Sequence, residues 1–128
     1  MERTKGNKEK FKREFKERIY QFILELLEFI DVLPNDSVAR IIKNQLIRSG
    51  TSIGANYIEA GASSSKRDFA NFLHYSLKSC NESIFWLTLL RDLNKGDRKK
   101  IESLLRELTE IANIFGSSLL TIKGKRKF

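Results

Sequence analysis

The sequence predicts an all-α protein, an antiparallel up-down-up-down four-helix bundle, on three observations. Apolar residues recur every three or four positions through four segments, which is the spacing of one helical face. No stretch alternates apolar and polar residues or contains an Asn-Gly or Asp-Gly hairpin turn, so no strand pattern competes. The connections between segments are only a few residues long, and short connections make successive helices antiparallel neighbours.

The first helix is expected over residues 8–33. Pro34 ends it, because proline disfavours helical geometry at the residue before it. Charged residues such as Lys12 and Glu28 fall mostly on the opposite side of this helix. Its predicted inward face consists of Phe11, Phe15, Ile19, Phe22, Ile23, Leu26, Leu27 and Ile30.

The second helix is expected over residues 37–61, with Asn35, Asp36 and Ser37 as candidate N-caps. The second half of its apolar stripe is small or polar rather than rich in leucine, which is unusual for a bundle. The predicted inward stripe consists of Val38, Ile41, Ile42, Gln45, Ser49, Ser52, Ile53 and Asn56.

The third helix is expected over residues 66–93, where Ser65 followed by Asp68 is similar to a capping box. Its predicted inward face consists of Phe69, Phe72, Leu73, Ser76, Leu77, Cys80, Ile84, Leu87 and Leu90.

The fourth helix is expected to begin near Asp97 and to end at Gly124. Gly96 can adopt the left-handed conformation that closes the preceding helix, and Asp97 can cap the next one. Its predicted inward face consists of Ile101, Leu104, Leu105, Leu108, Ile111, Ala112, Phe115, Leu119 and Ile122.

Length and composition predict one domain over residues 1–128. Apolar residues make up 41% of the chain and charged residues 31%, which favours a folded soluble protein. No stretch reaches the ~18 uncharged apolar residues that cross a bilayer, and no secretory signal is recognisable. The single cysteine, Cys80, is interpreted as a small core residue, and its lack of a disulfide partner predicts a cytoplasmic location.

The excess positive charge lies at the two termini. The formal net charge is +8: residues 1–18 carry eight Lys and Arg against four Asp and Glu, and residues 123–128 carry four Lys and Arg. In an antiparallel four-helix bundle both termini lie at the same end, so these segments should converge there into one basic pole. Such a pole can bind phosphate by counterion release. The alternative is a pair of solvated ends that only aid solubility.

Gly50 and Gly54 are the most unusual residues of the second helix. Each glycine costs about 1 kcal/mol relative to alanine inside a helix. Their four-residue spacing places both on one face. Close approach of a neighbouring helix is the simplest reason to retain them.

Polar residues follow the same segment at three- and four-residue steps. They are Arg48, Ser52, Asn56 and Glu59, with Glu82 on the third helix as a partner for Arg48 and Trp86 as a cover for that pair. We interpret this cluster as a buried or subunit-facing polar network that fixes helix register. A ligand-binding or catalytic site is the alternative interpretation.

These residues also carry a family resemblance. The pattern runs Arg48-Ser49-x-x-Ser52-Ile53-x-x-Asn56-Tyr57-x-Glu59-Ala60, then the serine-rich turn, Phe69, and Glu82 with Trp86-Leu87. It resembles the four-helix-bundle proteins encoded within intervening sequences of bacterial large-subunit ribosomal RNA genes. These proteins are related to the accessory variability determinant of diversity-generating retroelements.

The resemblance implies a ring-shaped homopentamer. In the retroelement branch it also implies a basic ring that works with a reverse transcriptase and its template RNA. The segment with Gly50, Gly54 and Tyr57 is more similar to the intervening-sequence branch. The matching positions of the polar cluster carry structural roles in the family, and none corresponds to a catalytic residue.

Motifs for catalysis, metals or cofactors are not recognisable in the sequence. The lone His74 has no Glu-x-x-His spacing for a di-iron site, and no P-loop is present. We therefore expect a non-enzymatic homo-oligomer with no cofactor that binds nucleic acid, RNA or DNA, with structured RNA favoured. The expected binding residues are Lys5, Lys8, Lys12, Lys123, Arg126 and Lys127. The alternative is a protein-interaction scaffold that does not bind nucleic acid.

Overall fold

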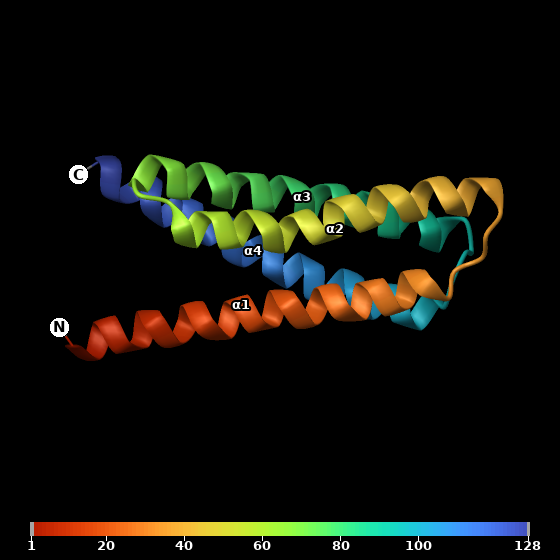
Figure 1. Ribbon diagram of the computed structural model, residues 1–128, viewed down its shortest axis with the longest axis horizontal. Coiled ribbons are helices and arrows are strands. Elements are labelled where there is room, and N and C mark those ends of the chain that lie inside the picture. Colours follow the sequence, from red (N-terminus) through yellow and green to blue (C-terminus); the bar gives the residue numbers. More distant parts are fainter. Residues whose placement is uncertain (1, 128) are drawn as a thin grey trace.

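Four helices form the bundle that the sequence predicts. A computed structural model describes the backbone of residues 2–127 and the side chains of residues 6–124. The helices are α1 (Glu2–Asp31), α2 (Ser37–Ala62), α3 (Lys66–Asp92) and α4 (Arg98–Lys127), and no strand occurs among the described residues. Figure 1 shows successive helices running in opposite directions along the long axis, with both termini at the same end of the bundle. None of these helices is long and apolar enough to cross a bilayer.

Side-chain caps start the last three helices. Asp36 accepts a hydrogen bond from the backbone N–H of Ala39 at 3.0 Å, and Ser65 accepts one from the N–H of Asp68 at 3.1 Å. The carboxylate of Asp97 likewise accepts from the N–H of Lys99 at 3.1 Å. These bonds satisfy N–H groups that have no partner within the helix.

The turn before α4 uses Gly96 in the left-handed conformation, with a φ of 90°. A Cβ atom there would lie 2.7 Å from Cδ2 of Leu33, so a larger residue would meet both backbone strain and a steric clash.

The first and last helices of the chain are longer than predicted. The helix α1 begins at Glu2 instead of residue 8, and α4 continues through Gly124 to Lys127. The added turns are rich in Lys, Arg and Glu, which are strong helix formers, and this propensity outweighs the cost of single glycines. At its other end α1 stops at Asp31, two residues before the predicted boundary.

The core fills the centre of the bundle with apolar side chains from all four helices. Its largest fully buried members are Phe22, Phe115, Ile19, Leu26, Leu46, Ile53, Leu87, Leu90, Ile101, Leu104, Leu108 and Ile111.

Three predicted inward residues are instead exposed. Val38 and Ile41 are 47% and 62% exposed, because the inward stripe of α2 begins with Ala39 and Ile42. Phe11 is 51% exposed. It lies on the N-terminal half of α1, which diverges from α2 and α3 in Figure 1.

Small polar residues allow α2 and α3 to pack closely. The hydroxyls of Ser49 and Ser83 are buried and lie 2.7 Å apart. The buried Ser76 hydroxyl donates to the backbone carbonyl of Ile53 at 3.0 Å. Among the described side chains, no buried nitrogen or oxygen lacks a hydrogen-bond partner. Burial of these hydroxyl groups therefore costs little folding free energy, since each of them has a hydrogen-bond partner.

Candidate nucleic-acid interface

Arg48 and Glu82 meet between α2 and α3, as their positions predict. The Arg48 guanidinium donates to the carboxylate of Glu82 and, at 3.0 Å, to the side-chain carbonyl of Gln45. The indole N–H of Trp86 donates to the same carboxylate at 3.0 Å. The Arg48 side chain is 59% exposed, so the pair lies at the surface of the single chain. The prediction that this pair is buried within the chain is therefore wrong. The alternative, that the pair faces a neighbouring subunit, stays a prediction.

The other three polar residues bind elsewhere. The hydroxyl of Ser52 donates to the backbone carbonyl of Arg48 at 2.7 Å, and the amide of Asn56 donates to the carbonyl of Ser52 at 3.0 Å. Glu59 is exposed. These bonds stay within α2, so Ser52 and Asn56 satisfy the backbone of their own helix and do not extend the ion pair.

We expect Arg48→Ala to lower the free energy of unfolding by less than about 1 kcal/mol, because exposed ion pairs contribute little. Urea denaturation of the variant and the wild type measures this. Arg98→Ala, which removes the exposed pair with Glu102, is the control and should have an effect of similar size. A loss for Arg48→Ala several times that of the control would show that the pair is protected from solvent in the assembled protein.

Gly50 and Gly54 lie where α1 crosses α2. A Cβ atom on Gly54 would be 2.8 Å from Cδ1 of Ile23, and one on Gly50 would overlap the buried side chain of Leu26. The predicted close approach is present, and the neighbouring helix is α1.

The predicted basic residues fall into two groups. Lys8, Lys12 and Lys123 are exposed at the end of the bundle where the chain begins and ends. No ion pair to an acidic side chain engages these three within the described part of the chain. The other three predicted residues have side chains outside the described residues: Lys5, Arg126 and Lys127.

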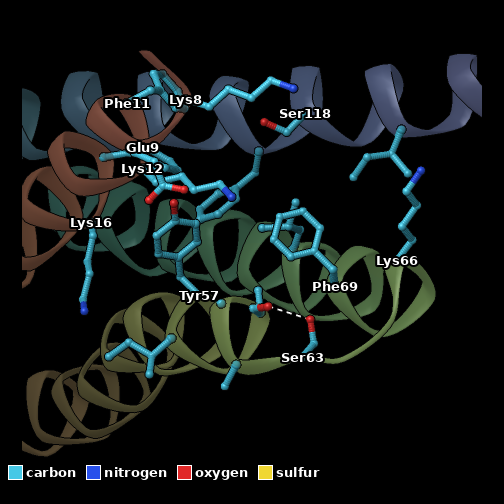
Figure 2. Close-up of a pocket in the computed structure, with 18 of the residues that line it drawn as sticks. Lys8, Glu9, Phe11, Lys12, Lys16, Tyr57, Ser63, Lys66, Phe69 and Ser118 are labelled. Atoms are coloured by element: carbon cyan, nitrogen blue, oxygen red, sulfur yellow. Dashed lines mark hydrogen bonds between the residues drawn. The ribbon is translucent and has the colours of Figure 1, made fainter. Parts of the chain in front are cut away.

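A wide groove opens at the basic pole, and sequence reasoning missed it. It has a volume of about 1200 Å³ and lies between the N-terminal half of α1, the end of α2, the start of α3 and the end of α4. Figure 2 shows the Tyr57 hydroxyl directed toward the side chains of Glu9 and Lys12 in this groove, with Phe69 to one side. Lys8 extends along the α4 side near Ser118, whereas Lys16 points away.

The floor of the groove is aromatic and closely packed. The Tyr57 ring packs edge-to-face against Phe15 and Phe115, with centroid distances of 5.3 and 5.9 Å, and Phe115 is fully buried. Partial burial raises the pKa of the Tyr57 hydroxyl, so this group stays protonated near neutral pH. The groove therefore offers flat apolar surfaces and a hydrogen-bond donor.

The rim of the groove is strongly cationic. The lining residues include one acidic residue, Glu9, and five basic ones, of which Lys16 points away from the groove. The ligand that best complements this surface has both an apolar face and negative charge. The basic lining residues are Lys8, Lys12, Arg13, Lys16 and Lys66.

A second ionic cluster, also missed from the sequence, holds α1 to α4. Arg18 donates two hydrogen bonds of 2.7 Å to the carboxylate of Glu107 and a further one to Glu110. The hydrogen bond from Arg18 holds the pKa of Glu107 below its ordinary value, and the two carboxylates raise the pKa of Arg18. The residues are 89 and 92 positions apart, and no local pattern could have paired them.

The cluster predicts a specific loss of stability in acid. The pKa of Glu107 is lower in the folded than in the unfolded state, so its stabilisation is complete above the unfolded value of 4.5. It disappears as the pH falls through the lower folded value. We expect Glu107→Gln to lose less stability than the wild type between about pH 6 and pH 3, as followed by urea denaturation. Glu59→Gln, on an exposed part of α2, is the control, and parallel curves for all three proteins would contradict the prediction.

The remaining candidates for chemistry are isolated. His74 is exposed, and the described residues contain no group of three or more His, Cys, Asp or Glu side chains that could hold a metal ion. Cys80 is fully buried, and burial raises the pKa of its thiol to about 12. The thiol is therefore protonated and shielded, as its predicted core position requires.

Comparison with known proteins places this bundle in a family. The sequence model of the family described as 23S rRNA-intervening sequence protein matches residues 12–117. The chain belongs to this family. A solved structure of similar fold is a protein of unknown function from the S23 ribosomal protein family of Bacteroides thetaiotaomicron. It is 34% identical, with a TM-score of 0.77, over 82% of this chain and 97% of that one. No curated protein matches the chain.

The family match includes Arg48, Gly50, Gly54 and Glu82 but stops short of the basic ends. Of the six residues expected to bind nucleic acid, only Lys12 falls within residues 12–117, at the first matched position. The polar cluster and the glycines thus lie in the part shared with the 23S rRNA-intervening sequence proteins. Most of the basic pole lies in segments beyond it.

Proposed function

We propose that this protein is a non-enzymatic homo-oligomer that binds structured RNA through its basic pole. The observation that carries the proposal is the position of the termini. The chain starts α1 and ends α4 at the same end of the bundle, and the two terminal segments carry the whole excess charge (Figure 1). The family's association with ribosomal RNA intervening sequences supports RNA as the partner.

Binding would arise from phosphate neutralisation. Lys8, Lys12 and Lys123 are solvated and free of ion pairs among the described side chains, so they can replace counterions at the RNA backbone. A closed ring of subunits would present several poles to one RNA, and avidity would strengthen a weak contact. We expect five subunits, as the family resemblance implies. Native mass spectrometry should then give a particle of five times 14.9 kDa.

Charge-neutral variants test the proposal directly. The triple variant Lys8→Gln, Lys12→Gln, Lys123→Gln should bind a hairpin RNA about 100-fold more weakly at ~0.15 M salt. The slope of log affinity against log salt should fall by about one for each lysine removed. Fluorescence anisotropy with a labelled hairpin measures both quantities. Neutralising the side chains is preferable to trimming residues 1–18, because that segment includes the core residue Phe15.

A matched triple variant controls for net charge. Lys78→Gln, Lys99→Gln and Arg106→Gln remove the same charge from exposed positions elsewhere on the bundle. This control should keep most of the affinity and most of the salt slope. Equal losses in the two triple variants, or no binding by the wild type, would contradict the proposal.

A protein-interaction scaffold is the second candidate, and exposed apolar side chains favour it. Val38 and Ile41 lie one helical turn apart on α2 and are 47% and 62% exposed, and adjacent exposed apolar side chains can mark contacts with other proteins. This function would need neither the basic pole nor RNA. Binding that is insensitive to salt and to the Lys8, Lys12 and Lys123 substitutions would favour it.

A further inference from the structure

We propose that the groove at the basic pole receives unpaired nucleotides of the bound RNA. In this arrangement the bases stack on Phe11, Tyr57 and Phe69, while Lys8 and Lys12 neutralise the adjoining phosphates. The inference rests on the proposed function and adds a selectivity to it: the protein should prefer single-stranded segments to duplex.

The aromatic side chains carry the first part of the argument. Phe11 is 51% exposed and Tyr57 and Phe69 are half-buried, so each ring leaves surface open to a ligand. The Phe11 ring lies against Phe15, with centroids 5.8 Å apart and an angle of 23° between the planes. The buried Phe15 ring in turn packs on Tyr57, so Phe11 and Tyr57 are supported by the same core side chain. Bases of unpaired RNA stack on such surfaces whatever their sequence.

The charges carry the second part. Purely apolar ligands would leave the basic rim unpaired, and a simple anion would leave the aromatic floor uncovered. A nucleotide complements both, since its base is flat and apolar on its faces and its phosphate is negative. Figure 2 shows Lys12 directed into the groove beside Tyr57 and Lys8 crossing toward Ser118, which places ammonium groups around the aromatic floor.

The groove is larger than a typical site for a single small metabolite. The volume of about 1200 Å³ exceeds the ~300–1,000 Å³ typical of sites for one small ligand. The groove is open along the end of the bundle, so a strand could pass through it. A duplex has its base faces covered by stacking and would contact only the lysines.

Part of the groove lies outside the segment that the family model matches. Lys8, Phe11, Ser118 and Ile122 line it, and all four lie outside the family match to residues 12–117. The proposed selectivity is therefore a property of the extended ends of α1 and α4.

Fluorescence of 2-aminopurine tests the inference. We expect a ten-nucleotide single-stranded RNA with a central 2-aminopurine to be quenched on binding the full chain, because the base stacks on a ring. Phe11→Leu and Phe69→Leu should each weaken binding of this RNA about 5- to 150-fold, the equivalent of ~1–3 kcal/mol per stacked base. Binding of a duplex of equal length and the salt slope should both stay unchanged.

Phe85→Leu is the matched control. It makes the same substitution at a side chain of similar exposure, 58%, on a part of α3 that does not line the groove. It should leave quenching and affinity unchanged. Thermal melting checks the fold of each variant, and Phe11→Leu keeps the test valid if Phe69→Leu is unstable.

Two failures can be told apart. If the wild type binds single strand and duplex alike, with a steep salt dependence and no quenching, the groove proposal is overturned and the basic-pole function stands. If neither RNA binds, both proposals fail. Equal losses in Phe11→Leu and Phe85→Leu would also overturn the groove proposal, since the effect would then not belong to this site.

Discussion

Replacement of Phe15 by alanine is expected to lower the free energy of unfolding by about 3–5 kcal/mol, the range for deleting a buried phenylalanine side chain. Phe15 is only 5% exposed, and its ring packs edge-to-face on both Tyr57 and Phe115, with centroids 5.3 and 5.2 Å away. Among the described side chains of α1 it is the first buried one, so the change should also free the start of that helix. Urea denaturation gives the first effect, and hydrogen exchange of the backbone amides of residues 6–14 gives the second.

Phe11→Ala is the control for this variant. Phe11 lies one helical turn earlier on α1 and is half-exposed, so its removal should cost about 1 kcal/mol or less. Comparable losses in the two variants would contradict the view that Phe15 is the anchor of α1. Hydrogen exchange of residues 6–14 that stays slow in Phe15→Ala would also contradict that view.

Gly54→Leu is expected to destabilise the bundle by up to about 2 kcal/mol. A Cβ atom at this position would lie 2.8 Å from Cδ1 of Ile23 and 3.7 Å from Cγ2 of Ile19, so a leucine side chain must displace the Ile23 side chain and crowd the contact between α1 and α2. Overpacking of this kind typically costs ~1–3 kcal/mol. The gain in helix propensity from removing a glycine, about 1 kcal/mol, offsets part of that cost. Thermal melting and native mass spectrometry together report on packing and assembly.

Gly116→Leu provides the matched control in the interior of α4. Nothing lies within 4 Å of a Cβ atom at that position, so the propensity gain should appear without a clash. Its melting temperature should stay at or above that of the wild type. A Gly54→Leu protein that keeps the wild-type mass and melting temperature would refute the account of a close contact between α1 and α2.

Much of the fold could be predicted because local chemistry determines it. Pro34, Gly96 and the caps Asp36, Ser65 and Asp97 mark the helix boundaries, and each signal acts over only a few residues. The helical repeat of the apolar residues identified most of the core. The boundary errors at the start of α1 and the end of α4 arose where exposed charged residues extend a helix without an apolar repeat.

The candidate site could be predicted only in part, because it depends on how helices are spaced. The charge count placed a basic pole at the termini, and the family signature pointed to Arg48 and Glu82. The groove could not be foreseen, since Phe11 continues the apolar repeat and the repeat cannot show that α1 diverges there. Similarly, the pairing of Arg18 with Glu107 depends on the rotation of α1 relative to α4.

The buried thiol of Cys80 makes the opening of this bundle measurable. It is the only cysteine in the chain, and it lies in the core on α3 with no exposed surface. A thiol reagent can reach it only when the helices separate, so the rate of thiol modification depends on how often the bundle opens. At low reagent concentration that rate reports the equilibrium between closed and open forms, and at high concentration it reports the opening rate itself. The same sulfur can therefore report, without an engineered cysteine, whether RNA or neighbouring subunits hold the four helices together.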